Sequence, residues 1–174
     1  MLKNTLLFTL FCLNIFFSKL NGELILPANN SIINYVHVLF EWDQIPHTYE
    51  YRIQISTASD FSEVVTDTTV SFLIYIDDNN IQWSSDYFWR IRPIYTDQQG
   101  PWSEVNTFST GQKRSEATAV LYNDQQYSMG LTIFGSFYNY YSAMIDKNGN
   151  EVWNTGNNKI VYYSTTPYLD LLGC

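Results

Sequence analysis

The chain of 174 residues carries 9 basic and 17 acidic side chains, which gives a formal net charge of −8 at pH 7. This excess of acid disfavours nucleic acid and anionic lipid as partners, because no surplus of cations exists to replace phosphate counterions. With 45% hydrophobic and 15% charged residues, the chain can build a packed core and is not compositionally disordered. Its 5 Trp, 14 Tyr and 11 Phe residues favour β structure.

The amino terminus has the layout of a secretory signal. Lys3 precedes an apolar run of 13 residues, 5–17, and a short polar stretch then ends at Gly22. A helix that spans a bilayer needs about 20 apolar residues, so this run is too short for a stable membrane anchor. We therefore expect 1–22 to be a signal peptide and the chain to be secreted, periplasmic or held at the cell surface. Its removal takes away two lysines and no acid, which brings the net charge from −8 to −10.

After this removal Cys174 is the one remaining cysteine. A secreted module with a single cysteine has no internal disulfide, so its stability must come from packing.

Residues 23–110 contain runs in which apolar and polar side chains alternate, which predicts strands with one inward face. Turn-forming residues separate these runs, and about seven short strands in about 90 residues is the layout of an immunoglobulin-like β-sandwich. The strands are expected at 36–42, 49–55, 61–68, 70–76, 87–92 and 102–108, besides a first one before them. The predicted core consists of Val38, Phe40, Trp42, Tyr51, Ile53, Ile55, Tyr87, Trp89 and Phe108.

The same segment resembles a fibronectin type III domain of the kind found in secreted bacterial multidomain proteins. The resemblance rests on Val-x-Phe-x-Trp at 38–42, Tyr-x-Ile-x-Ile at 51–55, Tyr-x-Trp-Arg-Ile-Arg at 87–92 and Gly-Pro-Trp-Ser-x4-Phe-Ser-Thr at 100–110. It implies that Trp42 is the core tryptophan of the second strand. It also implies that the hydroxyl of Tyr87 ties back to the corner before its strand.

Three residues of this segment are candidates for a binding surface. Arg90 and Arg92 project from the face opposite Trp89, and Trp102 on the following strand is placed to stack on one of them. We interpret this as a surface stack that pins the last two strands together, with a ligand-binding ladder as the alternative. His37 and His47 are expected to be solvated, and no cluster has metal-ligand spacing. We therefore predict no catalytic, metal or cofactor-binding residue and no cofactor.

Residues 111–118 form a polar, charged linker, and 119–174 form a different kind of segment. Two apolar runs, 129–135 and 140–146, are followed by Asn148-Gly149 and then Glu151-Val152-Trp153. Asn-Gly between alternating runs is a strong hairpin signal. Asp146 begins a sequence with some likeness to a calcium loop, but the length and the bidentate glutamate of an EF-hand are missing.

The residues 130–136 and 141–153, which end in Ile-Asp-Lys-Asn-Gly-Asn-Glu-Val-Trp, resemble the opening of the arylsulfotransferase family of β-propellers. That resemblance implies sulfuryl transfer through a histidine that lies in a later blade. Neither histidine of this chain is in the matching region, and a propeller needs at least about four blades. The expected architecture is therefore an all-β chain, a sandwich followed by a partial hairpin segment of a truncated propeller-like domain.

Three classes of function compete. The first is a secreted, non-catalytic interaction or spacer module of a larger extracellular protein, whose partners are neighbouring domains, extracellular protein or carbohydrate. The second is the amino-terminal fragment of an arylsulfotransferase-like enzyme whose catalytic part lies outside this chain. The third, a small hydrolase, is rejected because no nucleophile–base arrangement is recognisable in the sequence. Whether the parent protein is an enzyme stays open.

Overall fold

The computed structural model describes residues 22–115, 130–136 and 141–156. All regular elements in these ranges are β-strands, and none of the described residues belongs to a helix that could cross a membrane. The predicted signal peptide lies outside the described residues. The chain divides into two compact units. The first comprises 22–31, Leu39–Ile76 and Asp86–Phe108, and the second comprises Ile32–Val38, Asp77–Ser85 and the described residues from Ser109 onward.

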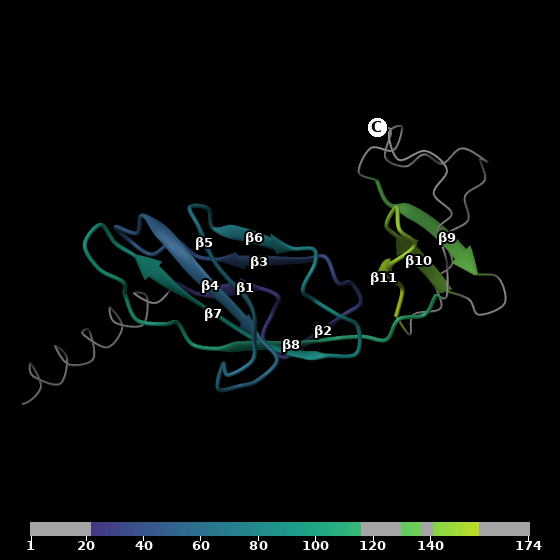
Figure 1. Cartoon of the computed structure of the whole chain (residues 1–174), viewed down its shortest axis with the longest axis horizontal. Coiled ribbons are helices and arrows are strands. Elements are labelled where there is room, and N and C mark those ends of the chain that lie inside the picture. Colours follow the sequence, from purple (N-terminus) through teal and green to yellow (C-terminus); the bar gives the residue numbers. More distant parts are fainter. Residues whose placement is uncertain (1–21, 116–129, 137–140, 157–174) are drawn as a thin grey trace, which may run out of the picture. The chain divides into compact units, whose positions relative to one another are not determined.

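Eight strands form two sheets of a sandwich (Figure 1). One sheet has the order β1-β3-β6 and the other has the order β2-β8-β7-β4-β5. Several sheet neighbours, such as β2 and β8 or β7 and β4, are not consecutive in the chain, and this crossing-over is typical of immunoglobulin-like and fibronectin type III sandwiches. The strands are β1 Leu24–Leu26, β2 Ser31–Ile33, β3 Val38–Trp42, β4 Glu50–Ser56, β5 Val64–Val70, β6 Ile74–Asp77, β7 Asp86–Ile94 and β8 Asn106–Thr110. The predicted all-β sandwich is confirmed.

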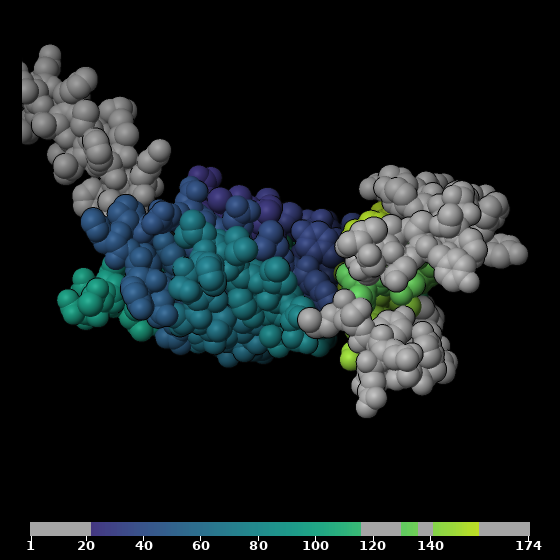
Figure 2. Space-filling model, turned by 90° about the horizontal axis from the view of Figure 1, so that it is seen from above, coloured from purple at the N-terminus to yellow at the C-terminus, as the bar shows by residue number. Residues whose placement is uncertain are grey.

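Aromatic rings fill the space between the two sheets of the first unit. Phe40 of β3 lies with its ring centroid 5.1 Å from Trp89 and 5.8 Å from Phe108, which belong to the opposite sheet. Both contacts are edge-on, the arrangement that aromatic quadrupoles favour. In the space-filling view of Figure 2, the residues of this unit are among those coloured from purple to teal. All nine residues predicted for the core are buried: Val38, Phe40, Trp42, Tyr51, Ile53, Ile55, Tyr87, Trp89 and Phe108.

Several strand boundaries differ from the predicted ones. Phe61 was expected to begin a strand, but its φ of 60° is left-handed, which extended structure excludes, and β5 starts at Val64. β7 continues through Pro93 where the prediction ended before it. The carbonyl of Pro93 accepts a bond from Gly100, so its nitrogen also faces the segment after β7. The missing N–H therefore removes no bond between β7 and β4.

Two aromatic residues lie outside the strands in which they were expected. Tyr49 was expected to begin the strand 49–55, but β4 begins one residue later and the Tyr49 side chain is 73% exposed. Trp102 was placed on the last strand, but β8 begins only at Asn106. The segment with Trp102 still follows β7 because the N–H of Ser103 donates to the carbonyl of Ile91 at 2.7 Å.

The second unit contains a three-stranded antiparallel sheet of order β11-β10-β9. Its strands are β9 Thr132–Ser136, β10 Tyr141–Ile145 and β11 Glu151–Asn154. The predicted Asn-Gly hairpin joins β10 to β11, and Gly149 supplies its φ of 84°. The carboxylate of Asp146 accepts the N–H groups of Asn148 and Asn150, each at 2.8 Å. Asp146 therefore closes a turn.

Residues 111–115, the described part of the predicted linker, are tied into the second unit. The N–H groups of Arg114 and Ser115 donate to the carboxylate of Glu151, which is 3% exposed. The side-chain amide of Asn154 donates to the same carboxylate at 2.6 Å. One buried carboxylate thus holds the end of the 111–115 segment against β11.

Candidate functional site

The outer face of the five-stranded sheet carries the candidate site. Inward side chains of β4 and β7 are odd-numbered and buried, so the even-numbered side chains point away from the core. The register places Arg52 opposite Arg92 and Gln54 opposite Arg90. Asp67 of β5 lies opposite Gln54 on the other side of β4. Strand pairing alone therefore gathers three arginines, an amide and a carboxylate.

Two of the arginines are stacked with aromatic rings. The guanidinium carbon of Arg90 lies 3.7 Å from the ring centroid of Phe61 and 4.3 Å from that of Trp102. The guanidinium carbon of Arg92 lies 4.4 Å from the Trp102 centroid. The structure thus brings together the three residues singled out in the sequence, and it adds Phe61. Each cation–π contact is worth about 0.5–1 kcal/mol at an exposed position. We call these four residues, with Arg52, the arginine–tryptophan ladder.

A hydrogen-bond chain fixes the other side of the ladder. Arg52 donates to both carboxylate oxygens of Asp67 at 2.6 Å, a bidentate ion pair. Gln54 donates to Asp67 at 2.9 Å and accepts from Arg90 at 3.1 and 2.7 Å. Asp67 thus orients Arg90 through the amide of Gln54. Sequence reasoning missed Arg52, Gln54 and Asp67, because their contacts depend on the β4–β5 register.

Arg52 pairs with the carboxylate of Asp67 and Arg90 bonds to the amide of Gln54, so neither Arg90 nor Arg92 has a carboxylate partner among the described residues. The Nε of Arg92 is buried and has no hydrogen-bond partner among the described residues. Partial burial of Arg90 lowers its pKa, and the nearby charge of Arg92 lowers it further. A guanidinium stays protonated at neutral pH, so the ladder does not accept protons in a reaction. Guanidinium groups can donate hydrogen bonds to an anion.

The ion pair gives Asp67 a testable titration. The hydrogen bonds from Arg52 are the main cause that holds the pKa of Asp67 below its ordinary value, and Gln54 adds to this while partial burial opposes it. The folded-state pKa is therefore lower than the unfolded one. The resulting stabilisation is present above the ordinary aspartate pKa and is lost as the pH falls through the folded-state value.

We expect carbon-13 NMR titration to place the Asp67 midpoint below that of an unperturbed aspartate. Arg52→Gln should move it back toward the ordinary value, and Lys113→Gln, which removes an exposed cation of the second unit, should leave it unchanged. An ordinary midpoint for Asp67 in the unsubstituted chain would contradict the bidentate pair.

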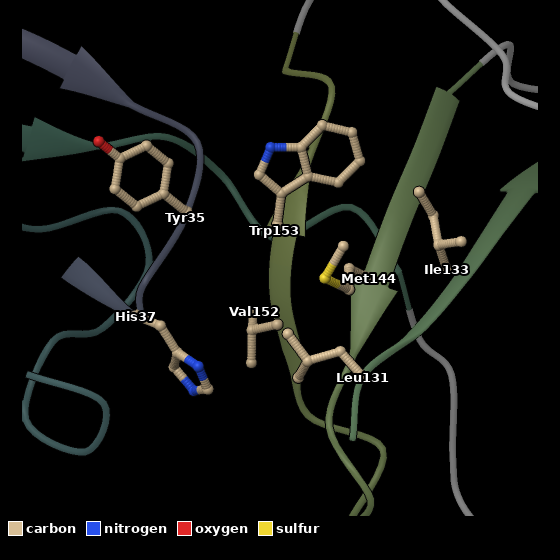
Figure 3. Close-up of a pocket in the computed structure, with 7 residues that line it drawn as sticks. All are labelled: Tyr35, His37, Leu131, Ile133, Met144, Val152 and Trp153. Carbon is tan, nitrogen blue, oxygen red and sulfur yellow. The ribbon is translucent and has the colours of Figure 1, made fainter. Parts of the chain in front are cut away.

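A pocket lies in the second unit, with a cavity volume of about 400 Å³. His37 and Tyr35 line one side, and Val152, Met144 and Leu131 lie across from them (Figure 3). Burial raises the pKa of Tyr35. His37 was expected to be solvated but is half-buried here, whereas His47 is exposed. The described residues hold no group of three or more His, Cys, Asp or Glu side chains suited to a metal ion.

Comparisons with known proteins give structural neighbours only. No protein-family model and no curated protein sequence matches the chain. Among solved structures, it is similar to a fibronectin type III domain of the human KIAA0970 protein, with 15% identity, a TM-score of 0.42, and coverage of 56% of this chain and 75% of that one. The sixth such domain of human fibronectin type III domain containing protein 3 has 14% identity and a TM-score of 0.43, and the match covers 57% of this chain and 89% of that one. An Fn3-like protein from Clostridium thermocellum has 12% identity and a TM-score of 0.39, and the match covers 51% of this chain and 98% of that one.

Proposed function

We propose that this chain is a non-catalytic interaction module of a larger extracellular protein, and that it binds its partner through the arginine–tryptophan ladder. The observation that carries the proposal is the pair of guanidinium groups of Arg90 and Arg92, whose carbons lie 4.3 and 4.4 Å from the ring centroid of Trp102. Export is supported by the signal-like segment 1–22. The partner is an extracellular saccharide or protein.

A purely structural role explains only part of the ladder. Backbone bonds from Gly100 and Ser103 to β7 already hold the segment that carries Trp102. The Ser103 hydroxyl also accepts the N–H of Ile91 at 3.1 Å. Arg92 stacks on Trp102 as well, and its Nε has no hydrogen-bond partner among the described residues. A cation that is already fixed in position loses less side-chain entropy when a partner binds.

The test is binding of the purified full chain to an array of extracellular saccharides and proteins. We expect saturable binding to at least one member, weakened about tenfold or more by Trp102→Ala, which removes the platform for both guanidinium groups. Lys113→Gln is the control, because Lys113 lies in the second unit. Binding that is equally strong in Trp102→Ala, or no saturable binding at all, would refute the proposal.

The second candidate is the amino-terminal part of an arylsulfotransferase-like protein. It is favoured by the β10–β11 hairpin, which carries the Asp-Lys-Asn-Gly-Asn turn on which the resemblance rests. Sulfate transfer from a phenyl sulfate donor by the product of the complete reading frame would support this candidate. If that product transfers no sulfate but still binds its array partner, the second candidate is refuted and the interaction module remains as the function.

A further inference from the structure

We propose that Asn29 is a modification site that carries an N-linked glycan. The residues Asn29-Asn30-Ser31 match the acceptor pattern Asn-x-Ser/Thr, and no other asparagine of the 174 residues begins such a pattern. Asn29 also follows closely on Gly22, where the signal-like segment ends. The inference rests on the export that the proposed function includes, because this modification belongs to secreted chains.

The turn between β1 and β2 presents the Asn29 side chain to solvent. The N–H of Ser31 donates to the carbonyl of Ala28 at 3.0 Å, which closes a turn with Asn29 and Asn30 at its centre. Asn30 adopts a left-handed φ of 60°, which asparagine tolerates better than most residues. Asn29 and Asn30 are both exposed. The acceptor side chain therefore lies at the surface, as a bulky, hydrated glycan requires.

The two ends of the Asn29 amide differ in their contacts. Its Oδ1 accepts the N–H of Thr107 at 2.9 Å, which ties the turn to β8. Its Nδ2 donates no hydrogen bond to any described residue. A glycan is attached through Nδ2, so it leaves the bond between Oδ1 and Thr107 in place. The folded chain can therefore keep this turn unchanged after the modification.

The hydroxyl of Ser31 is needed by the acceptor pattern but not by the described fold. Its Oγ is buried and has no hydrogen-bond partner among the described residues. A buried hydroxyl without a bond costs free energy, and alanine at this position would avoid that cost. The acceptor pattern requires a hydroxyl two residues after the asparagine. A requirement that precedes folding therefore accounts for a serine at this position.

The modification forms one bond and breaks one. The Nδ2 of Asn29 bonds to C1 of the first sugar of an oligosaccharide carried on a lipid diphosphate, and the C1–O bond to the diphosphate breaks. The lipid diphosphate leaves with the electron pair of that bond, and one amide proton passes to a base of the transferase. Thr107 comes much later in the chain, so the Asn29 amide has not yet met its β8 partner when the amino-terminal part is exported.

A groove beside Asn29 gives the glycan room. Its cavity volume is about 890 Å³, and Asn29 is one of the residues that line it. Glu23, Gln44, Glu104 and Asn106 also line the groove, and all of them belong to the first unit. Carboxylate and amide oxygens accept hydrogen bonds from hydroxyl groups, and amide N–H groups donate them. We therefore expect the first sugar residues to lie along this groove.

The modification is tested on the full chain exported by its source cells and, for the variants, by cultured insect cells. Enzymatic release of the glycan converts the modified asparagine to aspartate, and we expect peptide mass spectrometry to find this conversion at Asn29 in most of the exported chain. Asn29→Gln and Ser31→Ala should both lose the glycan. Ser31→Thr keeps the acceptor pattern, and Asn30→Gly keeps both the pattern and the left-handed φ, so these two controls should stay modified.

Ser31→Ala keeps the test independent of folding. Because the Ser31 hydroxyl makes no bond among the described residues, the unmodified variant should unfold at the same urea concentration as the unmodified natural chain or at a higher one. An exported natural chain without a glycan at Asn29, or a glycan that persists at Asn29 in Ser31→Ala, would overturn the site.

The position of the sugar is tested by comparing amide chemical shifts of the glycosylated chain with those of the same chain made without a glycan. Changes should extend from Asn29 to Gln44, Glu104 and Asn106, and Ala143 of the second unit should not change. Changes limited to the residues next to Asn29 in the chain would refute the contact with the groove.

A second form of the chain, with the leader of a known secreted protein in place of 1–22, separates the inference from the proposed function. If this form is glycosylated at Asn29 while the natural form stays inside the cell, the site stands and export through 1–22 is refuted. If the natural form is exported without a glycan, export stands and the site is refuted. Array binding that depends on Trp102 would keep the interaction module in either case.

Discussion

Replacing Trp42 by alanine should destabilise the sandwich by about 3–5 kcal/mol, because it empties the space of a large buried aromatic side chain. The Trp42 side chain is 1% exposed, and its ring lies edge-on to that of Tyr51 with the centroids 5.6 Å apart. Urea denaturation followed by circular dichroism measures the change in the free energy of unfolding. A cost below about 1 kcal/mol would place Trp42 at the surface and overturn the strand register.

Two further variants sharpen this test. Trp42→Phe should cost clearly less than Trp42→Ala, because phenylalanine fills part of the space that alanine leaves empty. Phe72→Ala is the matched aromatic control. Phe72 is 72% exposed, so its loss should change stability by no more than about 0.5 kcal/mol.

Glu151→Ala should have the second largest effect, on the second unit. It leaves the N–H groups of Arg114 and Ser115 and the amide of Asn154 without their carboxylate acceptor. Leaving a buried donor unpaired costs about 1–3 kcal/mol, so the three together should destabilise this unit by roughly 3 kcal/mol or more. Amide hydrogen exchange at Asn154, whose N–H donates to the carbonyl of Asn34, should then accelerate by about 100-fold.

Glu104→Ala is the control for this second prediction, because Glu104 is exposed and belongs to the first unit. It should leave exchange in β10 and β11 unchanged. If Glu151→Ala also leaves exchange unchanged, the carboxylate does not hold the 111–115 segment.

The sequence predicts the inward and outward faces of the long strands because alternation is a local property. Trp42, Tyr51 and Trp89 follow from period two alone, and so does the outward direction of Arg90 and Arg92. Alternation does not mark where a strand stops. The left-handed φ of Phe61 and the irregular segment of Trp102 are set by turn geometry and by the bonds of Ser103, so both residues were placed in strands.

Long-range pairs were beyond local reasoning. Arg52 meets Asp67 only because the β4–β5 turn sets a register that places Gln54 opposite Asp67. Glu151 bonds N–H groups more than 30 residues away in the chain. Neither pair has a spacing signature that a single sequence reveals, because the folded chain brings the partners together.

The most direct measurement of the binding surface is the footprint of the best array ligand on the full chain, mapped by amide chemical-shift changes. The largest changes should fall on the outward positions of β4 and β7 and on the segment around Trp102. The β1-β3-β6 sheet and the second unit should change little. Changes concentrated on that sheet or on β9 to β11 would show that the ligand binds elsewhere, and the arginine–tryptophan ladder would then be a structural contact alone.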